Sequence, residues 1–146
     1  MARIDQRANN ELRPVHFTPN FSDYAEGSIL IETGKTCVLC NVSVEDKLPD
    51  WRMDSGGGWL TAEYGMLPRA THRRMPRSRG SESARSQEIR RLIGRALRAS
   101  IDLDKLGPRT LTIDCDVLQA DVSRQGIQQL LAKQQALLNN EMNGKK

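Results

Sequence analysis

Residues 28–44 read Ser-Ile-Leu-Ile-Glu-Thr-Gly-Lys-Thr-Cys-Val-Leu-Cys-Asn-Val-Ser-Val. Apolar and β-branched residues on both sides of a Gly-Lys pair are typical of two strands joined by a tight turn. Gly34 supplies the positive φ that such a turn often needs. We therefore predict a β-hairpin with strands over residues 28–33 and 36–44, and we interpret the rest of the chain around it.

Downstream of the hairpin, two further stretches predict strands. Residues 110–119 alternate apolar and polar side chains, which indicates a half-buried strand. Its predicted apolar face carries Leu111, Ile113, Cys115 and Val117. Residues 59–64 predict a shorter strand. The intervening residues 46–58 contain Pro49 and the three consecutive glycines 56–58, so we expect a loop there.

A helix is predicted from Ser83, which is a favourable N-cap residue. The apolar residues fall at helical spacing on one face: Ile89, Leu92, Ile93, Ala96 and Leu97. This pattern weakens at Ser100, and Gly107-Pro108 blocks any continuation. The preceding residues 75–83 are rich in Ser, Gly and Pro and predict a flexible connection. The expected fold class is therefore α+β, a mixed sheet with a helix packed on one face.

Positive charge is concentrated in the middle of the chain. Residues 69–98 contain ten arginines, no lysine and only two acidic residues, Glu82 and Glu88, within a chain of net charge +4. Arg offers a planar fork that binds phosphate through two hydrogen bonds, whereas Lys is a point charge. The arginines predict either a solvated helix face with a basic loop, or a binding surface for a polyanion such as RNA or DNA.

The three cysteines do not predict a metal site. Cys37 and Cys40 have the C-x-x-C spacing, but they lie in a predicted strand, where residues three apart point to opposite faces. We expect reduced thiols that serve as small apolar residues. The carboxylates of Asp114 and Asp116 could serve acid–base chemistry, but an exposed polar strand face accounts for them equally well.

Composition excludes several protein classes. The apolar runs are much shorter than the ~20 residues that span a bilayer, so we expect no membrane partner. The polar, mixed-charge residues 1–13 do not resemble a signal peptide. We therefore expect a cytoplasmic protein.

Several motifs in one order now point to a family. The central motif is Gly65-Met-Leu-Pro-Arg-Ala-Thr-His72, preceded by Gly58-Trp-Leu-Thr-Ala-Glu-Tyr64. Residues 12–15, 26–28, 87–89, 91–99 and 114–121 add shorter matches at the expected spacing. This combination resembles ribonuclease PH over residues 3–121. The resemblance implies a ribonuclease PH fold over residues 1–121, which we expect to be incomplete, followed by a divergent tail, 122–146, that is helical or disordered.

The resemblance implies phosphorolysis of RNA. Inorganic phosphate attacks the last phosphodiester at the 3′ end, and a nucleoside diphosphate leaves; the family acts on transfer-RNA precursors and ribosomal RNA. Arg85 matches the family arginine that holds phosphate at the start of the helix. Ser123 and Arg124 match the second phosphate contact, but both glycines of the family sequence are missing there. Val122 resists the backbone conformations that glycine permits.

The same resemblance assigns the RNA-guiding arginines and the partners. Arg69, Arg73, Arg74 and Arg77 lie in the region that guides RNA in the family. The family assembles as a homo-oligomeric ring and uses inorganic phosphate as co-substrate. Its catalysis depends on magnesium. We identify no magnesium ligand and no catalytic residue in this chain, because the aspartates of the family come after the region of resemblance.

Beyond Asp121 the chain departs from the family sequence, which a reading-frame change or a truncated gene would explain. Without the following elements, we expect exposed apolar faces and open strand edges. Three functions stay open: a phosphate-dependent 3′-5′ exoribonuclease, a non-catalytic RNA-binding or ring-building module, and an inactive product.

Overall fold

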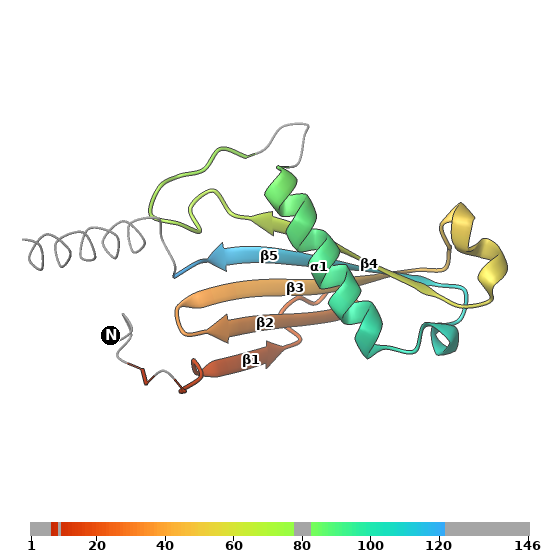
Figure 1. Ribbon diagram of the computed structural model, residues 1–146, viewed down its shortest axis with the longest axis horizontal. Helices are drawn as coiled ribbons and strands as arrows, with labels where there is room; N and C mark the ends of the chain where they lie inside the picture. Colours follow the sequence, from red (N-terminus) through yellow and green to blue (C-terminus); the bar gives the residue numbers. More distant parts are fainter. Residues whose placement is uncertain (1–6, 9, 78–82, 122–146) are drawn as a thin grey trace, which may run out of the picture.

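The computed structural model describes residues 7–8, 10–77 and 83–121. Within them, one sheet has the strand order β1-β2-β3-β5-β4, and one α-helix lies across a face of the sheet (Figure 1). The strands are β1 (Val15–Pro19), β2 (Gly27–Thr33), β3 (Thr36–Glu45), β4 (Trp59–Met66) and β5 (Thr110–Gln119). The helices are α1 (Ala84–Ser100) and the 3-10 helices η1 (Asp50–Ser55) and η2 (Leu103–Leu106). The predicted α+β fold class is confirmed.

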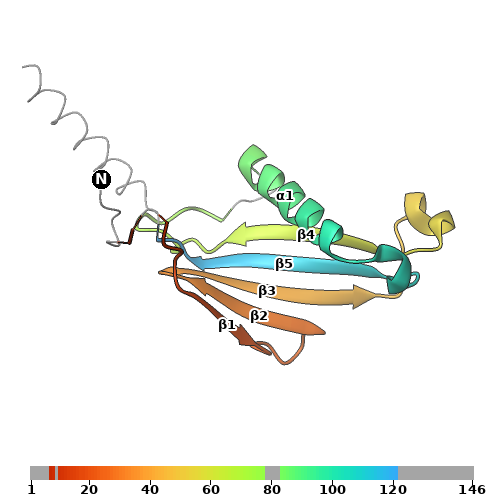
Figure 2. The same cartoon turned by 60° about the horizontal axis from the view of Figure 1, so that its bottom comes forward.

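The sheet combines antiparallel and parallel pairing. Strands β1, β2, β3 and β5 pair antiparallel in turn, whereas β4 pairs with β5 in parallel at the edge. Helix α1 connects the two parallel strands and lies above β4, at one side of the sheet (Figure 2). The predicted hairpin is confirmed, with Gly34 at φ +61° in its turn. Strand β1 and helix η1 were not predicted, because neither short segment carries a periodic pattern of its own.

Helix α1 begins as predicted, because the Ser83 hydroxyl accepts a hydrogen bond of 3.1 Å from the Ser86 amide. The predicted apolar stripe is buried in part, since Ile89, Ile93 and Leu97 are half-buried. Gly94 is buried, whereas Leu92 is 61% exposed. No helix in the described part of the chain is long and apolar enough to cross a membrane.

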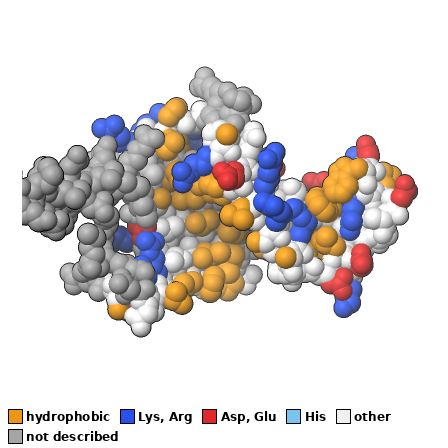
Figure 3. Space-filling view, viewed as in Figure 1, with side chains coloured by type: hydrophobic (Ala, Val, Ile, Leu, Met, Phe, Trp, Pro, Cys, Tyr) orange, Lys and Arg blue, Asp and Glu red, His pale blue; other side chains and the backbone are white. Residues whose placement is uncertain are grey.

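One face of the sheet is apolar across all five strands. Strand register aligns one such row through Phe17, Ile31, Val38, Val117 and Met66. On β4, which α1 contacts, Leu60 and Ala62 are each only 2% exposed. Away from the helix the cover ends: Phe17 is 56% exposed, and Figure 3 shows hydrophobic side chains gathered over the strands beside α1. The predicted exposed apolar face is therefore present in the described residues.

The glycine run before β4 has a packing reason. A Cβ on Gly58 would lie 2.6 Å from Leu106 Cδ2 and 2.8 Å from the Gly107 carbonyl oxygen. We expect Gly58→Ala to lower the free energy of unfolding by ~1–3 kcal/mol, because backbone atoms would have to move. Urea denaturation measures the loss. Gly27→Ala is the control, since its Cβ would meet Val42 at an ordinary 3.5 Å; equal losses in both variants would contradict this explanation.

Candidate functional site

The loop that follows β4 is fixed to the end of β5. The Leu67 amide donates to the Val117 carbonyl at 3.0 Å, and the Ala120 amide donates to the Ala70 carbonyl at 2.8 Å. Ala70 is buried in this contact. Because β4 and β5 are parallel, their carboxyl ends meet at the same edge of the sheet (Figure 1). Open sheets often bind ligands outside the carboxyl ends of parallel strands, so this edge is the candidate site.

The predicted RNA-guiding arginines lie on this loop. Arg69, Arg73, Arg74 and Arg77 are all exposed, and among the described residues no acidic side chain pairs with them. The loop is held by hydrogen bonds from the Met75 amide to the Pro68 carbonyl and from the Thr71 hydroxyl to the Arg73 carbonyl, both 2.8 Å. Their positive charge is therefore presented to solvent at a fixed place on the sheet.

Asp121 joins three segments at the same edge. Arg13 Nη1 lies 3.0 Å from Asp121 Oδ2, and the Thr36 hydroxyl donates to Asp121 Oδ1 at 3.0 Å. The guanidinium offsets the carboxylate charge in a half-buried position, so Asp121 tethers the N-terminal segment and the β2–β3 turn to the end of β5. Sequence reasoning missed the roles of Arg13 and Thr36. Their only signal was the Leu-Arg-Pro-Val motif at residues 12–15, which says nothing about a partner far along the chain.

Arg85 lies in the first turn of α1 and is exposed. No acidic residue lies in that turn, so the free amides and the helix dipole there favour an anion. Figures 1 and 2 both place the start of α1 over the carboxyl half of β4. The loop after β4 that carries Arg69, Arg73, Arg74 and Arg77 is called the arginine loop below. Arg85 and the arginine loop therefore lie toward the same end of the sheet. The other predicted phosphate ligands, Ser123 and Arg124, fall outside the described residues.

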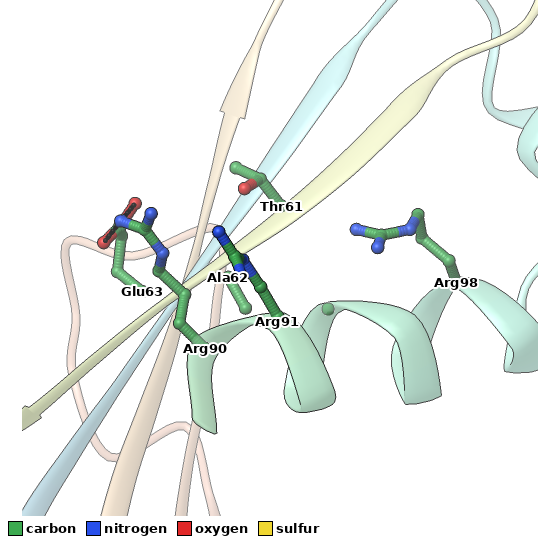
Figure 4. Close-up of a pocket in the computed structure, with 7 residues that line it drawn as sticks. Thr61, Ala62, Glu63, Arg90, Arg91 and Arg98 are labelled. Carbon is green, nitrogen blue, oxygen red and sulfur yellow. Dashed lines mark hydrogen bonds and ion pairs between the residues drawn. The ribbon is translucent and has the colours of Figure 1, made fainter. Parts of the chain in front are cut away.

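A shallow pocket of about 220 Å³ lies between α1 and β4 (Figure 4). Arg90 Nη1 contacts Glu63 Oε2 at 3.0 Å. Arg98 Nη1 donates to the Leu60 carbonyl at 2.9 Å, and its guanidinium carbon lies 4.6 Å from the centre of the Trp59 ring. Two arginines of the predicted solvated face therefore fasten the helix to the sheet. Gly94 leaves room for the Arg98 side chain, since a Cβ at that position would lie 2.9 Å from Arg98 Nη1.

The strand carboxylates lie on the opposite side of β5 from the apolar row. Asp114 is in register with Glu63. Burial raises the pKa of the Asp114 carboxyl, and the negative charges of Asp116 and Glu63 raise it further. Among the described residues, no group of three or more His, Cys, Asp or Glu side chains gathers that could hold a metal ion.

Comparisons with known proteins agree with this geometry. Residues 11–136 match the RNase PH family, described as the 3′ exoribonuclease family, domain 1. An exosome of Archaeoglobus fulgidus with RNA bound to the active site is 28% identical, with a TM-score of 0.70 over 82% of this chain and 49% of that one. An archaeal exosome core is 26% identical, with a TM-score of 0.62, covering 82% of this chain and 46% of that one.

Rrp46 of rice (Oryza sativa) has the same fold. It is 22% identical, with a TM-score of 0.67 over 83% of this chain and 53% of that one. The chain thus spans about half the length of the solved structures it matches.

Proposed function

Since the chain belongs to the 3′ exoribonuclease family and matches domain 1 of that family, we propose that it takes part in the phosphorolytic removal of nucleotides from RNA in the 3′-5′ direction. An oxygen of inorganic phosphate attacks the terminal phosphorus of the RNA. The bond from that phosphorus to the preceding 3′ oxygen breaks, and a nucleoside diphosphate leaves. The shortened RNA keeps a 3′ hydroxyl, so the same RNA molecule can react again. We propose transfer-RNA precursors as the substrate and the cytoplasm as the place of action.

One observation carries the proposal: the arginine loop is exposed, has no acidic partner among the described residues, and is anchored to the end of β5 through Ala70. Guanidinium groups in such a position bind the phosphates of an RNA backbone. In this proposal Arg69, Arg73, Arg74 and Arg77 guide the RNA.

Phosphate would be held at the start of α1. Arg85 supplies a two-pronged hydrogen-bond donor beside the free amides of the first helical turn. Ser123 and Arg124 would complete the pocket from the segment that follows Asp121, and the family match includes both residues. Magnesium, which the resemblance also implies, finds no cluster of three ligands among the described residues, so no step of the proposal passes through it.

The test is release of labelled nucleotide from a short RNA with a radiolabelled 3′-terminal nucleotide, with and without inorganic phosphate. We expect release only with phosphate, and only as nucleoside diphosphate. Release of nucleoside monophosphate without phosphate would indicate hydrolysis and contradict the proposal.

A second function is favoured by the same loop. If RNA binds with strong dependence on salt but no nucleotide leaves, the chain is a non-catalytic RNA-binding module. The exposed apolar face of the sheet, which includes Phe17, and the exposed Leu92 of α1 would then serve assembly with other copies into the homo-oligomeric ring that the resemblance implies. Absence of both RNA binding and release would leave an inactive product.

A further inference from the structure

Two cysteine thiols meet in the centre of the sheet. Cys40 on β3 and Cys115 on β5 are directly opposed in the antiparallel register, and their Sγ atoms are 3.6 Å apart. Cys115 is 6% exposed and Cys40 is half-buried. Cys37, the other half of the C-x-x-C pattern, is instead in register with Glu32. The pair that the sequence spacing indicates is thus not the pair that the fold brings together.

The positions of the two residues fit a covalent bond. Directly opposed residues of antiparallel strands have Cα atoms about 4.5–5.5 Å apart. A disulfide spans Cα separations of about 4.4–6.8 Å, so rotation of the two side chains could close the gap without separating the strands. The neighbours in the same row, Ile29 and Tyr64, lie on the outer sides of the pair and do not come between the two sulfurs.

The two thiols also differ in reactivity. The hydrogen bond with Cys115 lowers the pKa of Cys40 to about 7, against the opposing effects of burial and the charge of Asp116. The same hydrogen bond, together with burial, raises the pKa of Cys115. The thiolate is the form that reacts with oxidants, so the lowered pKa favours Cys40 as the thiol that reacts first. Cys115 stays protonated beside it.

We propose that Cys40 and Cys115 form a reversible cross-strand disulfide, a redox-controlled link between β3 and β5. With hydrogen peroxide as oxidant, the Cys40 thiolate attacks one oxygen, giving a sulfenic acid and hydroxide. The Cys115 sulfur then attacks the sulfenic sulfur, the S–S bond forms and water leaves. A low-molecular-weight thiol such as glutathione reverses the step by thiol–disulfide exchange.

The link would stabilise the centre of the sheet, where β3 pairs with β5. It joins residues 75 positions apart in the chain, so it restricts the unfolded state strongly. It also lies in the apolar face that α1 leaves partly open. A link of this span should raise the melting temperature by roughly 10 °C or more in a domain of this size.

The experiment treats the full chain with a small molar excess of hydrogen peroxide. We expect the intact mass to fall by about 2 Da, for two hydrogens, a Cys40–Cys115 peptide on mapping, and a melting temperature that rises and returns with dithiothreitol. Cys37→Ser should behave like the wild type, whereas Cys40→Ser should lose the response. Addition of oxygen without the mass loss, a disulfide through Cys37, or a covalent dimer would overturn the proposal. An intramolecular bond without a rise in melting temperature would overturn the stabilising role.

Discussion

Arg85→Ala is expected to raise the phosphate concentration for half-maximal release of nucleoside diphosphate by ~10-fold or more, because hydrogen bonds to a charged group are worth ~1.5–3 kcal/mol. Arg85 is exposed in the first turn of α1, where an anion gains from free amides and from the helix dipole. The substitution removes the side-chain clamp and keeps the backbone donors. We therefore expect a large effect on phosphate affinity and a smaller one on RNA affinity. The measurement is a phosphate titration at saturating RNA.

The matched control is Arg95→Ala. Arg95 is also exposed and lies on the same helix, ten residues on, which is ~15 Å along the axis. The Arg95→Ala substitution removes the same charge from the same helix. If it leaves the phosphate dependence unaltered, the effect of Arg85→Ala comes from the position of Arg85 and not from the loss of charge alone. Arg85→Lys separates charge from shape, since Lys keeps the charge and loses the two-pronged geometry. Equal losses in the Arg85 and Arg95 variants would indicate general attraction of RNA to a basic helix and would contradict a phosphate site.

Local patterns predicted the elements of this fold well. The alternation of apolar and polar residues over 110–119 predicted both ends of β5, and Ser83 predicted the start of α1. Both signals depend only on residues close together in the sequence. The position of β5 between β3 and β4 has no local signal. It follows from pairing between distant segments, as does the meeting of Cys40 with Cys115.

The candidate site was predicted in part. The arginine loop was placed by composition and by the resemblance, whereas its anchoring through Ala70 depends on backbone hydrogen bonds that no residue type specifies. The ion pair between Arg13 and Asp121 is likewise long-range. Apolar periodicity placed Leu92 on one face of α1 with Ile89 and Ile93, and of these three residues only Leu92 is exposed. The contacts of Arg90 with Glu63 and of Arg98 with the Leu60 carbonyl also hold α1 on β4, and no pattern of apolar residues indicates them.

Leu60→Ala is expected to lower the free energy of unfolding by ~2–5 kcal/mol, since the substitution opens a cavity in a packed site. Leu60 is 2% exposed beneath α1. Small domains are stable by only ~5–15 kcal/mol, so this one change removes a large share of the total. Urea denaturation followed by circular dichroism measures it, and an unchanged slope with urea would indicate that the unfolding transition itself is the same.

Leu92→Ala is the matched control for Leu60→Ala. It deletes the same side-chain atoms, but from a residue of α1 that is 61% exposed. We expect a change within ~0.5 kcal/mol, since exposed substitutions are usually that small and alanine favours a helix. A loss as large as that of Leu60→Ala would mean that Leu92 is buried in solution. If that loss grew with protein concentration, the apolar face beside α1 would be covered by another copy of the chain. If it did not, α1 would be rotated on β4, and the contacts of Arg90 and Arg98 that define its orientation would be wrong.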